Sequence, residues 1–226
     1  MGRSISLTSA DGFELGGYRA DPADRSRGGV VVVQEIFGVN THIRSVCDRF
    51  AALGYTAVAP SLFDRFARNF QSGYSPDEIA EARKLMANID WTKLLDDTGA
   101  GVDALRSIGP VAVIGFCMGG SVAFLAAARI EGLAASIAFY GGQIARHGDE
   151  RPHCPVQMHF GEKDEGIPMS DVTTIRGKRP DCEIYTYPAG HGFYCDQRAS
   201  FHAESAMIAW GRSLEFLERG MKKAKR

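Results

Sequence analysis

Four consecutive valines occupy positions 30–33 of this chain, directly after a polar, turn-rich segment. β-Branched residues favour extended backbone, and a strand that is apolar on both faces must be buried on both faces. Such strands form the centre of parallel sheets that helices cover on either side. The residues that follow the strand recur at helical spacing and end at a glycine: Ile43, Val46, Cys47, Phe50, Leu53 and Gly54. The pattern predicts a buried strand at residues 30–34 followed by an amphipathic helix.

Strand-like and helix-like segments alternate along the rest of the chain. A hairpin is expected around Asp11-Gly12, between short strands at residues 5–9 and 13–18. Further strands are expected at residues 56–60, 111–116, 136–140, 155–160 and 183–187, and helices at residues 77–88, 96–107, 118–129 and 200–217. This alternation implies a mostly parallel sheet with helices on both faces, and we predict one α/β domain over residues 1–226. Ligands of such sheets bind beyond the carboxyl ends of the strands.

Composition narrows the function classes. Lysine and arginine (26) nearly balance aspartate and glutamate (27), which excludes the basic surface that nucleic-acid binders need. The N-terminus lacks the apolar run of a signal peptide, and no stretch reaches the roughly 18 apolar residues of a membrane span. We therefore expect a soluble, cytoplasmic protein with no nucleic-acid or membrane partner. The five cysteines are scattered without CxxC spacing, so we expect neither a disulfide framework nor a metal site.

One cysteine lies between an expected strand and an expected helix, in Gly115-Phe116-Cys117-Met118-Gly119-Gly120. A nucleophile at such a junction lies on a tight turn, and the residues two before and two after it must lack side chains. Backbone N–H groups at the start of the helix can stabilise a thiolate and later an oxyanion. The alternative is that Cys117 is a small core residue between packing glycines. We predict Cys117 as a catalytic nucleophile.

A thiol nucleophile needs a base, and enzymes with this turn place nucleophile, acid and histidine in that chain order. His191, in Gly190-His191-Gly192, directly follows the expected strand at residues 183–187 and is the predicted base. The other histidines have ordinary interpretations. Surface or capping roles are expected for His42 and His202, a polar loop for His147 and His153, and the core for His159.

Three acids follow the expected strand at residues 155–160. Gly161 allows a sharp turn and Ile167-Pro168 can pack the return, which would leave Asp164 facing inward. Asp164 is therefore the predicted partner of the histidine. Glu162 and Glu165 are interpreted as surface acids.

Glu35 ends the valine strand, so its carboxylate is expected at the same sheet edge as Cys117 and poorly solvated. A buried carboxylate must be protonated, hydrogen-bonded or paired. A capping contact with the following loop is the alternative to a catalytic role. The backbone N–H groups of Ile36 and Met118 are the expected oxyanion hole.

The sequence resembles the dienelactone hydrolases (carboxymethylenebutenolidases), a cysteine-using branch of the α/β-hydrolase fold. Four motifs carry the resemblance: Gln34-Glu35-Ile36-Phe37-Gly38, the cysteine motif above, Gly161-Glu162-Lys163-Asp164 with Ile167-Pro168, and Gly190-His191-Gly192-Phe193. The resemblance implies a Cys117, His191 and Asp164 triad and an acyl-enzyme, with no metal or organic cofactor. It also implies that substrate binding shifts Glu35, which then removes the thiol proton.

The chain departs from this family at the groups that hold the substrate. The family has an arginine shortly after the catalytic histidine, where this chain has Cys195, and a second arginine near the start of a helix that is not evident here. Arg65, Arg68 or Arg198 could substitute, and residues 62–70 are interpreted as either a rim or lid, or a surface loop packed by its phenylalanines. Phe37 and Tyr140 are further candidates for substrate contact.

The predicted function is hydrolysis of a small-molecule ester or lactone. A thioesterase or acyltransferase could use the same acyl-enzyme. A non-catalytic binding protein could retain the fold, although an intact nucleophile, acid and base argue against it.

Overall fold

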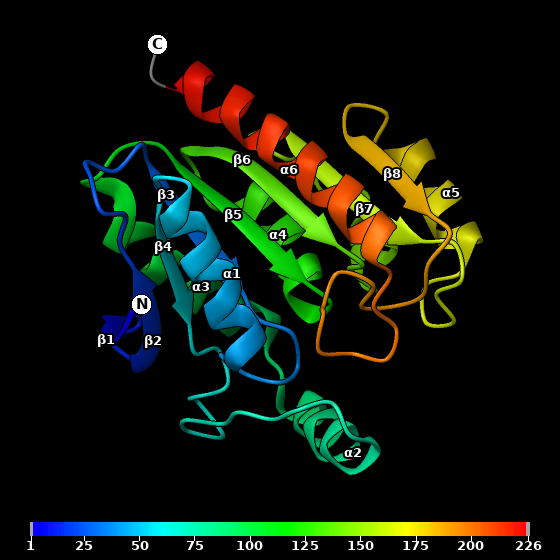
Figure 1. The fold of residues 1–226 in the computed structure, drawn as a ribbon, viewed down its shortest axis with the longest axis horizontal. Helices are drawn as coiled ribbons and strands as arrows, with labels where there is room; N and C mark the ends of the chain where they lie inside the picture. Colours follow the sequence, from blue (N-terminus) through cyan, green and yellow to red (C-terminus); the bar gives the residue numbers. More distant parts are fainter. Residues whose placement is uncertain (1, 225–226) are drawn as a thin grey trace.

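The computed structural model describes residues 2–224 and is built around one eight-stranded sheet (Figure 1). The strands lie in the order β1-β2-β4-β3-β5-β6-β7-β8. Their bounds are β1 Arg3–Thr8, β2 Glu14–Ala20, β3 Gly29–Val33, β4 Thr56–Pro60, β5 Val111–Phe116, β6 Leu133–Phe139, β7 Val156–Gly161 and β8 Glu183–Tyr187. Among the named strands of residues 2–224, β1 with β2 and β2 with β4 pair antiparallel and the other five pairs are parallel, so the predicted mostly parallel sheet is confirmed.

Helices cover both faces of the sheet (Figure 1). Their bounds are α1 Thr41–Ala52, α2 Pro76–Leu85, α3 Trp91–Arg106, α4 Met118–Arg129, α5 Met169–Lys178 and α6 Ala203–Ala224, with short 3-10 turns η1 Met86–Asn88 and η2 Ile144–His147. On one face α1 contacts α6, where the rings of Phe50 and Trp210 are 5.0 Å apart. On the other face α3 packs against α4. α2 lies off the sheet, beyond the carboxyl ends of the central strands (Figure 1).

The local patterns explain the central elements. Every residue of β3, β4, β5 and β6 is buried. The apolar runs of these strands predict this burial, because helices cover both faces of the sheet. The helix predicted from residue 96 begins earlier, at Trp91, because the Asp90 side chain accepts hydrogen bonds from the N–H groups of Thr92 (2.8 Å) and Lys93 (3.4 Å). The sequence patterns missed α5, whose apolar face is weak and buries only Val172 and Ile175.

Within residues 2–224, none of the helices combines the length and the apolar character required to cross a bilayer.

Candidate active site

Cys117 lies on the turn between β5 and α4, with φ 55° and ψ −116°. A side chain at this backbone conformation costs about 1–3 kcal/mol, and the surrounding structure must hold it there. Glycines make the turn possible. A Cβ atom at Gly115 would lie 1.8 Å from the carbonyl oxygen of Gly119, and one at Gly119 would lie 2.4 Å from the carbonyl oxygen of Val33. The turn therefore presents the thiol at the carboxyl edge of the sheet while α4 packs tightly beneath it.

The three side chains predicted as nucleophile, base and acid lie together. His191 Nε2 is 3.1 Å from the Sγ atom of Cys117, and His191 Nδ1 is 2.7 Å from Oδ2 of Asp164. The Asp164 side chain is fully buried, and its second oxygen accepts a hydrogen bond from the Gly166 N–H (2.9 Å). Glu162 and Glu165 are exposed. The carboxylate therefore holds the imidazole in the orientation that aims Nε2 at sulfur.

The surroundings of His191 control its proton affinity. Burial disfavours the imidazolium, but the adjacent Cys117 sulfur and the Asp164 carboxylate outweigh burial and raise the pKa of His191 to about 10. The ring of Tyr140, itself fully buried, lies with its centroid 5.0 Å from that of the His191 ring. The Cys117 sulfur and the Asp164 carboxylate therefore favour the protonated imidazolium of His191 over the neutral ring.

Glu35 follows β3 and is fully buried, but its partners are not those of a simple cap. Oε1 accepts a hydrogen bond from Arg198 Nη1 at 3.1 Å, and Oε2 accepts one from the Tyr74 hydroxyl at 3.1 Å. Arg198 also lies over the ring of Phe37, 5.6 Å from its centroid. The buried Glu35 carboxylate is therefore ion-paired with Arg198. The sequence offered Arg198 only as one of three arginines that could bind the substrate.

A pocket of about 140 Å³ opens directly beside the thiol. Its lining is mostly apolar and includes the two residues predicted to supply the oxyanion hole, Ile36 and Met118. The remaining lining comes largely from α2–α3 and the loops after β6 and β7: Met86, Trp91, Ser121, Gly142, Gln143, Gly166 and Ile167. Sequence reasoning missed this wall, because no local signal shows that Met86 and Trp91 reach the nucleophile.

A second hollow, of about 410 Å³, adjoins His191 on its other side. Three cationic side chains, Arg83, Lys163 and Arg198, line it together with two acidic ones, Asp164 and Glu165. Arg83 belongs to the last turn of α2, so that helix does contribute an arginine, although not near its start. An apolar pocket and a second pocket, in which cationic side chains outnumber acidic ones and which we call the cationic pocket, therefore lie on either side of His191.

Arg65 and Arg68, predicted as substrate contacts, are engaged elsewhere, and neither lines the two pockets beside His191. The Arg65 guanidinium binds the carboxylates of Asp97 (2.8 Å) and Asp11 (3.0 Å). Arg68 Nη2 donates to the carbonyl oxygen of Glu14 at 2.7 Å. These contacts tie residues 62–70 to the β1–β2 hairpin, and a substrate-binding role for Arg65 and Arg68 stays a prediction. The fully buried Phe63 packs on the rings of its neighbours in this loop, as expected for a packed surface segment.

Three other histidines test the remaining interpretations. His159 is a core residue, as predicted, with hydrogen bonds to the Tyr187 hydroxyl (2.8 Å) and Gln157 (2.9 Å). His202 caps α6, since its Nδ1 accepts from the Ser205 N–H at 3.3 Å. The surface role expected for His42 is wrong. Its side chain is fully buried, because the first turn of α1 points this residue toward the sheet.

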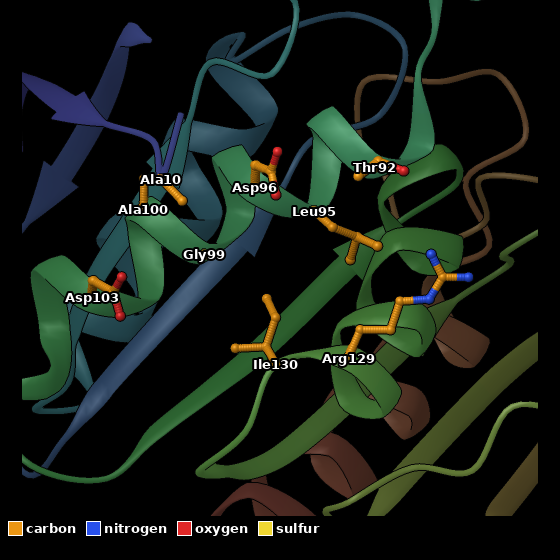
Figure 2. Close-up of a pocket in the computed structure, with 9 residues that line it drawn as sticks. All are labelled: Ala10, Thr92, Leu95, Asp96, Gly99, Ala100, Asp103, Arg129 and Ile130. Carbon is orange, nitrogen blue, oxygen red and sulfur yellow. The ribbon is translucent and has the colours of Figure 1, made fainter. Parts of the chain in front are cut away.

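Figure 2 shows a different hollow, of about 320 Å³, between the β1–β2 turn, α3 and the end of α4. Its charged side chains are already paired: Asp96 with Lys93, Asp103 with Arg106, and Arg129 with Glu150. It contains no cysteine or histidine. The candidate active site therefore remains the one at the carboxyl edge of the sheet.

Comparisons of the whole sequence with known proteins identify its family. Residues 15–221 match the sequence profile of the dienelactone hydrolase family. A Synechocystis protein described as "Putative carboxymethylenebutenolidase" is 36% identical, over 93% of this chain and 94% of its own. "Carboxymethylenebutenolidase 1" of Cupriavidus pinatubonensis is 30% identical, over 94% of this chain and 95% of its own.

Solved structures give the same relationship. The crystal structure titled "Putative Dienelactone Hydrolase" from Klebsiella pneumoniae superimposes with a TM-score of 0.80 at 34% identity, covering 97% of this chain and 99% of that one. A Pyrococcus furiosus esterase shares the fold at 17% identity, with a TM-score of 0.73 and coverage of 98% and 93%.

Proposed function

This chain belongs to the dienelactone hydrolase family, and we propose that it hydrolyses a carboxylic ester or lactone with Cys117 as the nucleophile. The observation that carries the proposal is the continuous contact from sulfur to imidazole to carboxylate, 3.1 Å and then 2.7 Å, beside an apolar pocket. Nucleophile, base and orienting acid within hydrogen-bond reach are the requirements of covalent acyl transfer.

The geometry supports a two-step reaction. In the first step Glu35 takes the thiol proton, the sulfur attacks the ester carbonyl, and the oxyanion accepts hydrogen bonds from the N–H groups of Ile36 and Met118. Collapse of the tetrahedral intermediate breaks the C–O bond, and the His191 imidazolium gives its proton to the departing oxygen. In the second step His191 removes a proton from water, water attacks the thioester, and the thiol is regenerated as the acid is released.

Glu35 and Arg198 couple substrate binding to thiol activation in this proposal. Arg198 lines the cationic pocket and also holds Glu35, so an anionic group of the substrate competes with Glu35 for the guanidinium. A carboxylate released from its ion pair can turn toward Cys117 and accept the thiol proton, as the family resemblance implies. The favoured substrate has a small apolar acyl part beside Cys117 and an anionic group facing Arg198, Arg83 and Lys163.

Replacing the nucleophile tests the mechanism. For Cys117→Ala, turnover of p-nitrophenyl acetate is expected to fall at least about 1,000-fold, because only binding and the oxyanion hole remain. Cys182→Ala is the matched control, since this half-buried thiol lies just before β8. Mass spectrometry of the quenched wild-type reaction should show an acetyl group on Cys117. Unchanged turnover in Cys117→Ala would refute the proposal.

The role of Glu35 has its own test. In Glu35→Gln, the pH dependence of Cys117 alkylation by iodoacetamide is expected to change, because the variant loses the carboxylate that can accept the thiol proton. Identical profiles for Glu35→Gln and wild type would remove Glu35 from the activation step.

A further inference from the structure

Behind the Glu35–Arg198 ion pair, three side chains from separate segments converge. Glu35 follows β3, His42 lies in the first turn of α1, and Cys195 lies in the loop between β8 and α6. One oxygen, one ring nitrogen and one sulfur of these residues lie within 4.8 Å of one another. All three residues are buried. Cys195 stands four residues after His191, and the triad makes no use of it.

His42 is anomalous in this cluster. Within residues 2–224 neither of its ring nitrogens has a hydrogen-bond partner, although its side chain is fully buried. An unsatisfied buried donor or acceptor costs about 1–3 kcal/mol, and native proteins rarely leave one without a partner. The Asp196 carboxylate, 59% exposed, stands 3.8 Å from Nδ1, which is too far for a hydrogen bond. The ring therefore has an unused ligand atom beside a carboxylate and a thiol.

We propose that Glu35, His42 and Cys195 form a binding site for a soft divalent cation such as Zn²⁺ or Cd²⁺. Thiolate, imidazole and carboxylate are each common zinc ligands in proteins. Ligand atoms around a tetrahedral zinc lie about 3.3–3.8 Å apart, given metal–ligand lengths of about 2.0–2.3 Å. The three atoms, which lie within 4.8 Å of one another, thus have to approach by no more than about 1.5 Å, which side-chain rotation can supply. Water or the nearby Asp196 carboxylate can complete the fourth position.

Binding has two chemical requirements. Cys195 must lose its thiol proton to solvent as the metal–sulfur bond forms, and burial raises the pKa of this thiol to about 12, so a cation must supply the driving force. The cation must also compete with Arg198 for Glu35, because the incoming charge repels the guanidinium. The Arg198 side chain is 16% exposed and already lines the cationic pocket, so it can withdraw there. Metal binding therefore weakens the Glu35–Arg198 ion pair.

The consequence for activity rests on the proposed function, whereas metal binding itself does not. A cation held by His42 and Cys195 fixes Glu35 away from Cys117, so Glu35 cannot accept the thiol proton. The bound metal is thus an inhibitor that acts behind the nucleophile.

Cadmium titration of the Cys117→Ala protein tests the site without the catalytic thiol as a competing ligand. An ultraviolet thiolate-to-cadmium band is expected to saturate at one equivalent. The band should vanish in Cys117→Ala/Cys195→Ser and persist in the matched control Cys117→Ala/Cys182→Ser. Adding His42→Gln to Cys117→Ala should weaken cadmium binding at least about tenfold. A band that persists in the Cys195→Ser double variant, or no saturable band in Cys117→Ala, would overturn the proposal.

A second measurement does not depend on the folding of the ligand variants. X-ray absorption at the zinc edge of Cys117→Ala loaded with one equivalent should show one sulfur and otherwise nitrogen and oxygen ligands. A shell without sulfur, or with several sulfurs, contradicts the site. For the inhibitory role, zinc should inhibit wild type strongly and Cys195→Ser at least about tenfold less; equal inhibition would place the effect at Cys117. Full activity of Cys117→Ala would refute the proposed function and leave the cadmium result standing.

Discussion

The ion pair between Glu35 and Arg198 is expected to show strong energetic coupling between its partners. The Glu35 side chain is 1% exposed and that of Arg198 is 16% exposed, so the pair is largely shielded from water. In Arg198→Met the carboxylate keeps its hydrogen bond from Tyr74 but loses its counter-charge, and breaking a buried pair in this way costs about 3 kcal/mol of unfolding free energy. In Glu35→Gln the guanidinium can reach solvent, so the cost is smaller, about 1 kcal/mol.

The double variant removes both charges and is expected to lose no more than about 2 kcal/mol. Independent losses would sum to about 4 kcal/mol, so the coupling free energy is about 2 kcal/mol. Urea denaturation of the four proteins at pH 7 measures this cycle. The exposed pair of Arg3 and Asp21, with side chains 64% and 31% exposed, is the matched control, and its Arg3→Met/Asp21→Asn cycle should couple by less than about 0.5 kcal/mol. Additivity of the Glu35 and Arg198 variants within about 0.5 kcal/mol would show that the buried pair is not formed in solution.

Three further predictions concern protonation and packing. The raised pKa of His191 means that its protonation stabilises the fold fully below about pH 6.5 and that this contribution is lost as pH rises through about 10. The difference in unfolding free energy between wild type and His191→Gln should therefore shrink between these two pH values. In Cys117→Ala the pH at which the contribution is lost should be lower, because the neighbouring sulfur is gone. Burial lowers the pKa of His159 to about 3, so its neutral form stabilises the fold above about pH 6.5. This contribution is lost as pH falls toward 3, and urea denaturation should show a loss of up to about 1.4 kcal/mol of unfolding free energy per pH unit. An unfolding free energy that does not change over this pH range would contradict the burial of a neutral His159. Gly119→Ala should lower the unfolding free energy by at least about 3 kcal/mol, because the added Cβ would lie 2.4 Å from a backbone oxygen. Gly99→Ala in α3 should raise it by about 1 kcal/mol, because nothing lies within 4 Å of the added Cβ. Equal melting temperatures of the two variants in thermal unfolding would refute the packing argument.

Local sequence patterns were sufficient to predict the parallel sheet and most of the helices of this protein. The valine run requires a strand that is buried on both faces, and the alternation of segments supplies the helices that bury it. The tight turn at Cys117 requires flanking residues without Cβ atoms, and the glycines beside it meet this requirement. The strand ends therefore located Cys117, Asp164 and His191 correctly at one edge of the sheet, and the structure brings them within hydrogen-bond distance. Their catalytic roles, and the assignment of the whole chain to one domain, stay predictions.

Local sequence patterns could not predict contacts between segments far apart in the chain. Arg65 and Arg198 are both arginines in loops, and only the folded chain directs Arg65 to Asp97 and Arg198 to Glu35. His42 looked like a surface residue, yet the orientation of α1 on the sheet buries it. Spacing determines what a turn or strand requires locally, because those forces act between near neighbours. The partner of a long charged side chain depends on the packing of whole elements, so the tertiary structure alone decided which arginine faces the site and that Cys195 joins Glu35 and His42.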